Sequence, residues 1–513
     1  MPAEGMPAPR SQQAIAWTHG RVAAVVFVAA LLVYVSNSAS FPPTETDTAP
    51  NAILPASILG DGDLAFSPFE APFMFHWSAK GASGEDVRVY VTDWTRKPPG
   101  SSKSYIEHYH EGRLEFAGPV YFLAPTVRER PGTGEPLFVG AFGPLAGLTA
   151  VPLVALGRAS GLFPNSDTPT LWALGRITAT LLVAGSVALL YLTAAGSVSR
   201  TQALLLAAAY GAGTCVWVIS SQSVWQQTPE IFFLSLGLFA LLRLPGPWIR
   251  GAVAGLAFSL AFACRPTAAI VAAVAGTWLL LSDREASAAY ALATLPAIGA
   301  MLTYNAYYFG SPLDFGQLAA GAGVAEYKTG SPDLWQTPLW LGAAGLLISP
   351  SRGLLVYSPF LAAAFAGAVL VWKDPRYRDL RFLTVAVLAL WIPAFLWFDW
   401  WGGWAYGYRP IVDSVPLLVI LCVPVVDWIL ARPAWRAAFV ALVAWSVLVQ
   451  VLGAFAYSPE GWNAKVIDSS GTLADVDRPA YRGRLWSFSD WQIGYLIAHF
   501  QRARAEREPH VLN

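Results

Sequence analysis

The chain has 513 residues, of which 55% are hydrophobic and only 13% are charged. Soluble domains carry about 25% charged residues, so this low charge, together with a mean hydropathy of +0.46, excludes a soluble enzyme and a disordered chain. The 33 basic and 33 acidic residues cancel, which leaves no overall positive field to bind nucleic acid. The composition therefore predicts a single polytopic, all-α membrane protein.

Long apolar runs mark the expected membrane-spanning helices. A span needs about 20 mostly apolar residues, and about eleven runs approach that length: 21–37, 170–195, 203–220, 229–243, 250–264, 266–281, 287–308, 353–372, 381–398, 411–431 and 435–456. The first run could also be a cleavable signal peptide. We favour a permanent span, because the loop that follows it carries a strong site candidate and needs a tether.

Arginines and lysines in short loops predict the orientation, because positive charge marks the cytoplasmic side. If residues 1–20 are cytoplasmic, most basic loop residues fall inside: Arg200, Arg243, Arg250, Arg284, Lys373, Arg376, Arg378, Arg381, Arg432 and Arg436. The short outer loops keep mainly Arg265, Lys328, Arg352 and Arg409. The charge asymmetry thus places the N-terminus inside.

This orientation holds only if the apolar stretch 138–156 does not cross the membrane. The stretch begins with Gly140, Gly143 and Pro144, which favours a re-entrant or interfacial helix over a full span. Three substantial segments then face outward: a large first loop at 38–169, a second loop at 309–352 and the tail 457–513. We expect the functional site on this outer face.

The first outer loop contains three aspartates of interest. Asp47 lies about ten residues beyond the first span, within reach of a substrate whose lipid tail stays in the bilayer. A carboxylate there suits a general base for an acceptor hydroxyl, although a cap of the helix expected over 50–59 is a simpler role. Asp61 and Asp63 could hold a divalent cation through oxygen ligands, but a turn that ends this helix explains them more simply.

Three arginines flank apolar runs on the predicted outer side: Arg265, Arg352 and Arg409. Ionisable groups at membrane depth are costly and tend to be paired or functional, and a guanidinium offers a phosphate two parallel hydrogen bonds. Any one of them could simply extend to the membrane interface. Three on one face predict a site for an anionic headgroup.

Aromatic and amide side chains crowd the same face. The candidates are Trp225, Gln226, Gln227, Glu230, Trp404 and Tyr408. An aromatic belt at the membrane interface accounts for many such rings. The mixture of rings with amides and a carboxylate fits a polar cleft for a carbohydrate equally well.

Taken in chain order, these segments resemble the GT-C superfamily of integral-membrane glycosyltransferases, in particular its bacterial protein-O-mannosyltransferase-like branch. The matching stretches are TDTAPNAILPASILGDGDL (46–64), SSQSVWQQTPE (220–230), LAFACRPTAA (260–269), YYFGSPLDFG (307–316), GLLISPSRGLLVYSPF (345–360) and WWGGWAYGYRPIVDSVP (400–416). The resemblance implies a GT-C-like transmembrane domain over 21–456, located in the bacterial inner membrane with its active site facing the periplasm. Asp47 corresponds to the family's base, but Thr48 stands where many relatives carry a second acidic residue.

The resemblance also implies the reaction. A sugar would move from a polyprenyl-phosphate donor to a hydroxyl of a lipid, polysaccharide or protein, with inversion at the anomeric carbon. The three arginines would stabilise the leaving phosphate. No cofactor is required, while a divalent cation stays possible at Asp61 and Asp63. The alternative is a transporter or flippase of lipid-linked sugars, but such proteins often contain internal repeats and this chain shows none.

Overall fold

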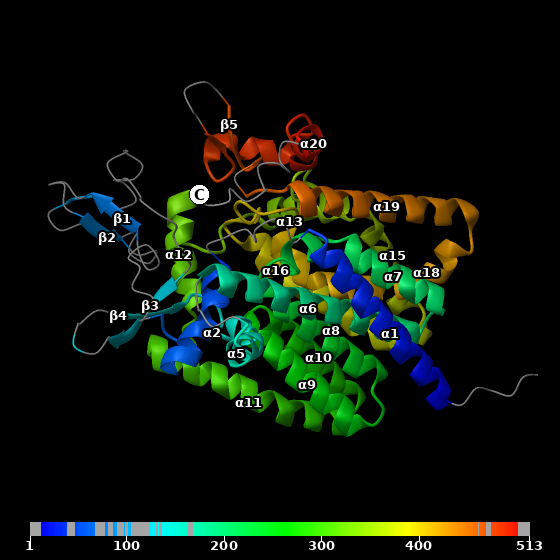
Figure 1. Ribbon diagram of the computed structural model, residues 1–513. Helices are drawn as coiled ribbons and strands as arrows, with labels where there is room; N and C mark the ends of the chain where they lie inside the picture. The colour runs from blue at the N-terminus through cyan, green and yellow to red at the C-terminus, as the bar shows by residue number, and fades with distance from the viewer. Residues whose placement is uncertain are drawn as a thin grey trace, which may run out of the picture.

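The structure, a computed structural model, describes residues 12–37, 47–66, 77–80, 86–89, 97, 101–103, 123–129, 132, 136–162, 168–459, 461–467 and 473–500. Most of these residues are helical, and the strands form three antiparallel pairs. Figure 1 shows the helices gathered into one body, with the C-terminal tail above α19 and strands β1 to β4 beside α12. The predicted helical membrane architecture is confirmed, with small strand pairs added to it.

Every apolar run predicted from the sequence contains a helix. The principal ones are α1 (Gln12–Val35), α6 (Thr168–Ala195), α7 (Arg200–Ala212), α8 (Gln227–Arg243), α9 (Pro247–Cys264), α10 (Ala268–Ser282), α11 (Arg284–Phe309), α15 (Ala362–Lys373), α16 (Arg381–Leu396), α17 (Val415–Leu421), α18 (Val423–Leu430) and α19 (Pro433–Ala456). Among the described residues, five helices are long and apolar enough to cross a membrane, or six if one bent pair counts as a single span. The protein is therefore an integral membrane protein, and the number of eleven spans stays a prediction.

Two predicted spans are broken, and prolines explain where. In the run 353–372, α14 (Leu354–Tyr357) stops at Ser358, whose φ of −139° and ψ of 62° are not helical. Pro359 follows, and a proline disfavours the helical conformation in the residue before it. In the run 411–431, the helices before and after Cys422 meet at 56°; Pro424 there lacks the N–H that a continuous helix needs.

The predicted first outer loop contains the helix that follows Asp47. The helix expected over 50–59 is α2 (Ala49–Asp61), and its residues 49–57 are buried against the rest of the protein. A Cβ on Gly147 would lie 2.9 Å from the Asn51 carbonyl oxygen, so glycine allows α4 (Leu145–Leu148) to pack tightly on α2. The position of α2 is thus fixed by close packing.

Asp61 and Asp63 form the turn that ends α2. Gly62 adopts a left-handed φ of 77°, and its N–H points back to the carbonyls of Ser57 and Ile58, as glycine does after many helices. The Ala65 N–H donates to Asp63 Oδ1 at 2.9 Å. Within the described part of the chain, no group of three or more His, Cys, Asp or Glu is arranged to hold a metal ion. Asp61 and Asp63 thus lie at the turn that ends α2, and a cation at this pair stays a prediction.

The stretch 138–156 contains the end of one strand and short helices. Strand β3 (Leu123–Glu129) pairs antiparallel with β4 (Pro136–Gly140), and α4 and α5 (Val151–Ala159) follow. β1 (Trp77–Lys80) and β2 (Asp86–Val89) form a second antiparallel pair. Neither α4 nor α5 alone approaches the length of a span.

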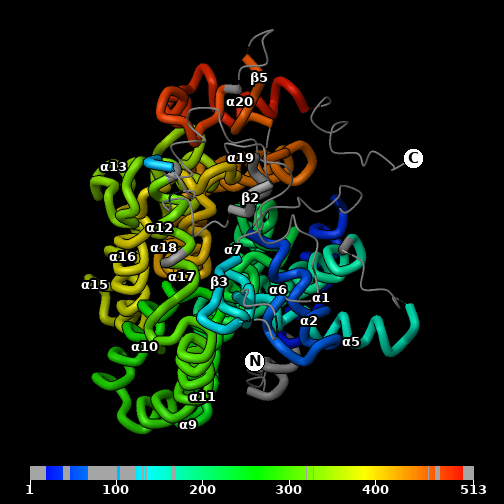
Figure 2. Tube along the Cα trace, turned by 90° about the vertical axis from the view of Figure 1, so that its left-hand side faces the viewer, coloured from blue at the N-terminus to red at the C-terminus, as the bar shows by residue number. Residues whose placement is uncertain are grey.

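The second outer loop and the tail are more ordered than their sequences indicate. The loop forms α12 (Gly316–Thr329) and α13 (Leu339–Ile348). The tail forms β5 (Ala464–Val466), β6 (Leu473–Asp475), the 3₁₀ helix η7 (Pro479–Trp486) and α20 (Gln492–Ala498). Trp462, Leu485 and Ile493 are buried in the main hydrophobic core. The tail is therefore integrated into the fold, at the end of the body where α13 and α19 also lie (Figures 1 and 2).

The predicted orientation can be tested with single cysteines in a background in which the three buried cysteines are replaced. Cysteines at Ser101 and Ser331 should react with an impermeant maleimide in intact spheroplasts. A cysteine at the exposed Ser282, the last residue of α10, should react only after permeabilisation. If Ser101 and Ser282 are labelled directly while Ser331 reacts only after permeabilisation, a further segment between Ser101 and Ser282 crosses the membrane and the orientation is wrong.

Candidate functional site

Asp47 and Arg409 form an ion pair between residues 362 positions apart in the chain. Arg409 begins the 3₁₀ helix η6 (Arg409–Ser414), and its Nη1 donates to Asp47 Oδ2 at 2.9 Å. Its Nη2 donates to the Gly402 carbonyl oxygen at 2.9 Å, and the guanidinium carbon lies 4.5 Å from the centre of the Trp225 ring. The Asp47 and Arg409 side chains are 25% and 17% exposed, so solvent or a ligand reaches both.

Local structure positions the start of α2, which directly follows Asp47 and Thr48. Thr48, rather than Asp47, occupies the N-cap position of α2 and makes no side-chain capping bond. Pro50 stands in the first turn, where a missing N–H costs nothing. Asn51, in the same turn, donates from Nδ2 to the Val224 carbonyl oxygen at 2.9 Å. This bond holds the start of α2 against the residue that precedes Trp225.

Arg265 joins a second charged cluster beside the first. It lies at the end of α9, forms an ion pair with the Asp413 carboxylate, and donates from Nη2 to the Pro410 carbonyl oxygen at 3.3 Å. Its Nη1 is also 3.9 Å from Oε2 of Glu230, whose side chain is 0% exposed. Because Pro410 follows Arg409 directly, the same short helix positions both arginine sites.

Asp413 is a member of this cluster that the sequence analysis did not single out. It is buried, and it lies inside the apolar run 411–431. An ionisable residue within such a run is itself a signal of function or pairing. The same signal would have found Arg176, which is buried in α6 and donates to Gln222 Oε1 at 2.5 Å.

Several buried oxygen atoms of the Arg265 cluster and of the start of α8 accept no hydrogen bond from the described residues. They are both carboxylate oxygens of Glu230, Oδ1 of Asp413 and the amide oxygens of Gln226 and Gln227. Gln226, the N-cap of α8, and Gln227, its first residue, lie four and three positions before Glu230, so each is a neighbour of Glu230 on the helix surface. Buried acceptors are normally satisfied, and hydroxyl groups of a ligand or water would supply the missing donors.

Arg352 lies apart from these clusters, in the protein core. Its side chain is 0% exposed. It donates to the carbonyl oxygens of Trp401, Ser351 and Gly403 at 2.7, 2.7 and 3.0 Å, and to Asn463 Oδ1 at 2.8 Å. The guanidinium N–H groups of Arg352 are therefore used to hold the backbone around Trp401 and Gly403 in place. The structure does not bring Arg352 to a surface where a lipid phosphate would lie.

Trp404 and Tyr408 lie in different surroundings. Tyr408 is fully buried; its hydroxyl is 2.7 Å from Ser358 Oγ and accepts from the Cys215 N–H at 3.2 Å. It packs in the core and has no surface on which a substrate could rest. Trp404 is only partly buried, and its Nε1 donates to Asp475 Oδ1 in the tail at 2.8 Å.

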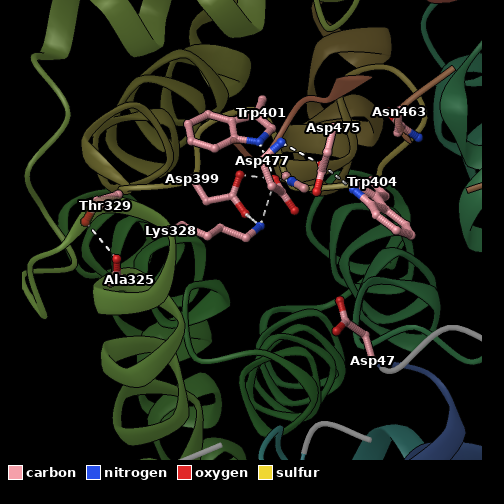
Figure 3. A network of polar contacts seen from close by, with 12 residues as sticks. Asp47, Ala325, Lys328, Thr329, Asp399, Trp401, Trp404, Asn463, Asp475 and Asp477 are labelled. Atoms are coloured by element: carbon pink, nitrogen blue, oxygen red, sulfur yellow. Dashed lines mark hydrogen bonds and ion pairs between the residues drawn. The ribbon is translucent and has the colours of Figure 1, made fainter. Parts of the chain in front are cut away.

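A lysine ties the segment 399–409 to two other parts of the chain. Lys328 Nζ lies 2.5 Å from Asp399 Oδ2 and 3.0 Å from Asp477 Oδ1 (Figure 3). Burial lowers the pKa of the Lys328 ammonium, but the carboxylates of Asp399 and Asp477 outweigh burial and raise the pKa above its ordinary value. Lys328 therefore remains charged at neutral pH.

Comparisons with known proteins show little similarity. No family model and no curated protein match this chain. A crystal structure of the oligosaccharyltransferase of Archaeoglobus fulgidus in complex with zinc and sulfate aligns with a TM-score of 0.43 and 14% identity, covering 85% of this chain and 54% of that one. Its apo form aligns with a TM-score of 0.41 and 14% identity, covering 84% and 54%. This chain thus spans about half the length of that enzyme, and a similarity of this size carries no argument about residues or activity.

The different surroundings of two arginines predict different effects of the same conservative change. Arg352→Lys should lower the apparent melting temperature of the detergent-solubilised protein, because an ammonium cannot reach all the acceptors of the guanidinium. Each buried polar group left unpaired costs about 1–3 kcal/mol. Arg409→Lys should have a much smaller effect, since that side chain is 17% exposed. Tryptophan fluorescence during heating at a fixed rate measures both, and equal shifts for the two variants would contradict the core role of Arg352.

Proposed function

We propose that the protein is a GT-C-type glycosyltransferase that moves a sugar from a polyprenyl-phosphate donor to a hydroxyl acceptor on the periplasmic face of the bacterial inner membrane. The single observation that carries the proposal is the partly exposed ion pair between Asp47 and Arg409. It joins the Asp47 carboxylate, which can accept a proton, to the Arg409 guanidinium, which can bind a phosphate. Asp47 lies in the segment that follows the first predicted span.

The resemblance seen in the sequence gains support from the way its segments meet. Stretch 46–64 contacts stretch 400–416 through Asp47 and Arg409, and stretch 220–230 through Asn51 and Val224. Stretch 260–269 contacts 400–416 through Arg265. Four stretches that are distant in sequence thus lie together in one site, as they must if they contribute to the same reaction.

The chemistry assigns a role to each charged group. The acceptor oxygen attacks the anomeric carbon while its proton passes to an Asp47 carboxylate oxygen. The bond between the anomeric carbon and the phosphate oxygen breaks, and its electron pair leaves with the lipid phosphate. Arg409 and Arg265 stabilise the charge on that phosphate. Attack opposite the leaving group inverts the anomeric configuration, and no cofactor enters the scheme.

The ion pair gives the site a resting state. When the donor is absent, Arg409 is neutralised by Asp47. A donor phosphate would compete for the same guanidinium, because phosphate accepts two parallel bonds from an arginine. Its arrival would free the Asp47 carboxylate to accept the proton, so donor binding itself would prepare the base.

The sugar would lie against the first turn of α8. Gln226 and Gln227 have amide oxygens there that accept no hydrogen bond from the described residues, and sugar hydroxyls are donors that match them. Glu230 is 0% exposed and would support the site through its contact with Arg265. The partly buried Trp404 ring would form another side of this site. Tyr408 and Arg352 have no contact with substrate in this scheme and act by holding the fold around it.

Asp47→Asn tests the base directly. The change keeps the size of the side chain but removes the proton acceptor, so transfer of labelled sugar from an undecaprenyl-phosphate donor to envelope acceptors should fall about 100- to 10,000-fold. Asp61→Asn, in the turn at the end of the same helix, is the matched control and should retain activity. Full turnover by a well-folded Asp47→Asn protein would reject the assignment. If the wild type binds the donor but never transfers the sugar, the flippase alternative is favoured.

Arg409→Lys tests the phosphate contact. A lysine keeps the charge but not the planar pair of donors, and hydrogen bonds to charged groups are worth about 1.5–3 kcal/mol. We therefore expect kcat/KM for the donor to fall about 10- to 100-fold. Arg376→Lys, at a side chain that is 79% exposed, should leave the kinetics unchanged. An Arg409→Lys enzyme with wild-type kinetics would leave Arg409 only its structural pairing with Asp47.

A further inference from the structure

Lys328 connects three segments that are far apart in the sequence. It stands near the end of α12 and contacts Asp399, which follows α16, and Asp477, which belongs to the tail. All three side chains are largely buried, with exposed fractions of 10%, 10% and 17%. A lysine buried between two carboxylates is costly to remove, because the remaining charges lose their partner.

One branch of this network leads to Arg409. The second oxygen of Asp399, Oδ1, accepts the Gly403 N–H at 2.9 Å, and the Asp399 carbonyl oxygen accepts the Gly402 N–H at 2.9 Å. Gly402 and Gly403 have φ of 72° and 64°, a conformation that other residues rarely adopt. The carbonyl oxygen of Gly402 then accepts from Arg409 Nη2 at 2.9 Å.

The other branch anchors the lysine in the tail. Asp477 Oδ1 also accepts from Trp401 Nε1 at 2.8 Å. Arg482 Nη2 donates to the Lys328 carbonyl oxygen at 2.7 Å, and its guanidinium lies 4.5 Å from the centre of the Trp401 ring. The tail thus holds both the side chain and the backbone of Lys328. In Figure 3, Asp47 lies away from the network, and no dashed line joins it to the residues drawn.

We propose that Lys328 is a positioning residue for the donor-phosphate site, held in place by Asp477 of the C-terminal tail. Through Asp399 it fixes the Gly402–Gly403 turn, and the Gly402 carbonyl orients the Arg409 guanidinium toward Asp47. The proposal rests on the proposed function, because it assumes that Arg409 binds the donor phosphate. The tail would then contribute to the donor-phosphate site indirectly, through Lys328 and Asp399.

The test compares Lys328→Met with two other variants. Lys328→Arg keeps the charge. Lys465→Met is the control: it removes a lysine of the tail whose Nζ lies 2.8 Å from Asp490 Oδ1. Hydrogen–deuterium exchange of the peptide 399–409 reports on the turn. Binding of undecaprenyl phosphate in detergent micelles reports on the phosphate site. We expect Lys328→Met to speed exchange and weaken binding about tenfold, Lys328→Arg to restore most of both, and Lys465→Met to change neither.

A double-mutant cycle separates positioning from a general loss of structure. If Lys328 acts through Arg409, the effects of the two substitutions on binding should not add. Lys328→Met should then weaken the binding of undecaprenyl phosphate much less in the Arg409→Lys protein than in the wild type. Equal losses in both backgrounds would overturn the proposal, and so would unchanged exchange over 399–409. If Lys328→Met fails to fold, Asp477→Asn makes the same comparison with a smaller change.

The experiment also distinguishes this proposal from the one on which it rests. A wild-type protein that does not bind undecaprenyl phosphate rejects the proposed function. The exchange measurement then still decides whether Lys328 orders the turn that contacts Arg409.

Discussion

The ion pair between Asp47 and Arg409 is the interaction on which the site depends. It is the point where the first outer segment meets the segment between α16 and α17. A charge near the membrane is costly unless it is paired or solvated, and in this pair each charge balances the other. Around the pair, Asn51 holds α2 against the start of α8, and Gly402 orients the arginine. The packing of α2 thus places the Asp47 carboxylate beside the Arg409 guanidinium.

The three arginines differ in their burial and in their partners, and these differences predict different roles. Arg352 is enclosed and donates only to neutral oxygens of the protein, so it stabilises the segment that carries the site. Arg409 is partly exposed and paired with the Asp47 carboxylate, which a phosphate can replace. Arg265 lies between two buried carboxylates, those of Asp413 and Glu230. A guanidinium with neutral partners fixes structure, whereas one balanced by an exchangeable anion is able to bind a ligand.

Helices were predictable from the sequence and long-range contacts were not. Apolar runs locate the helices because length and hydropathy are local properties, and the breaks near Pro359 and Pro424 follow from proline chemistry. The sequence also indicated Asp47, which lies about ten residues beyond the first apolar run, and Arg409, which stands beside another run. It could not place Arg352 in the core, because a position beside a run does not determine burial. The contact of Lys328 with Asp477 spans 149 residues, and no local pattern indicates it.

A structure with bound undecaprenyl phosphate, determined by electron cryo-microscopy, tests the central claim most directly. We expect density for the phosphate against the guanidinium of Arg409 and beside that of Arg265. The Asp47 carboxylate should be released from Arg409 and face the space where an acceptor hydroxyl would enter. The lipid chain should run from there toward the membrane. Phosphate density elsewhere, with the pair between Asp47 and Arg409 intact, would contradict the account.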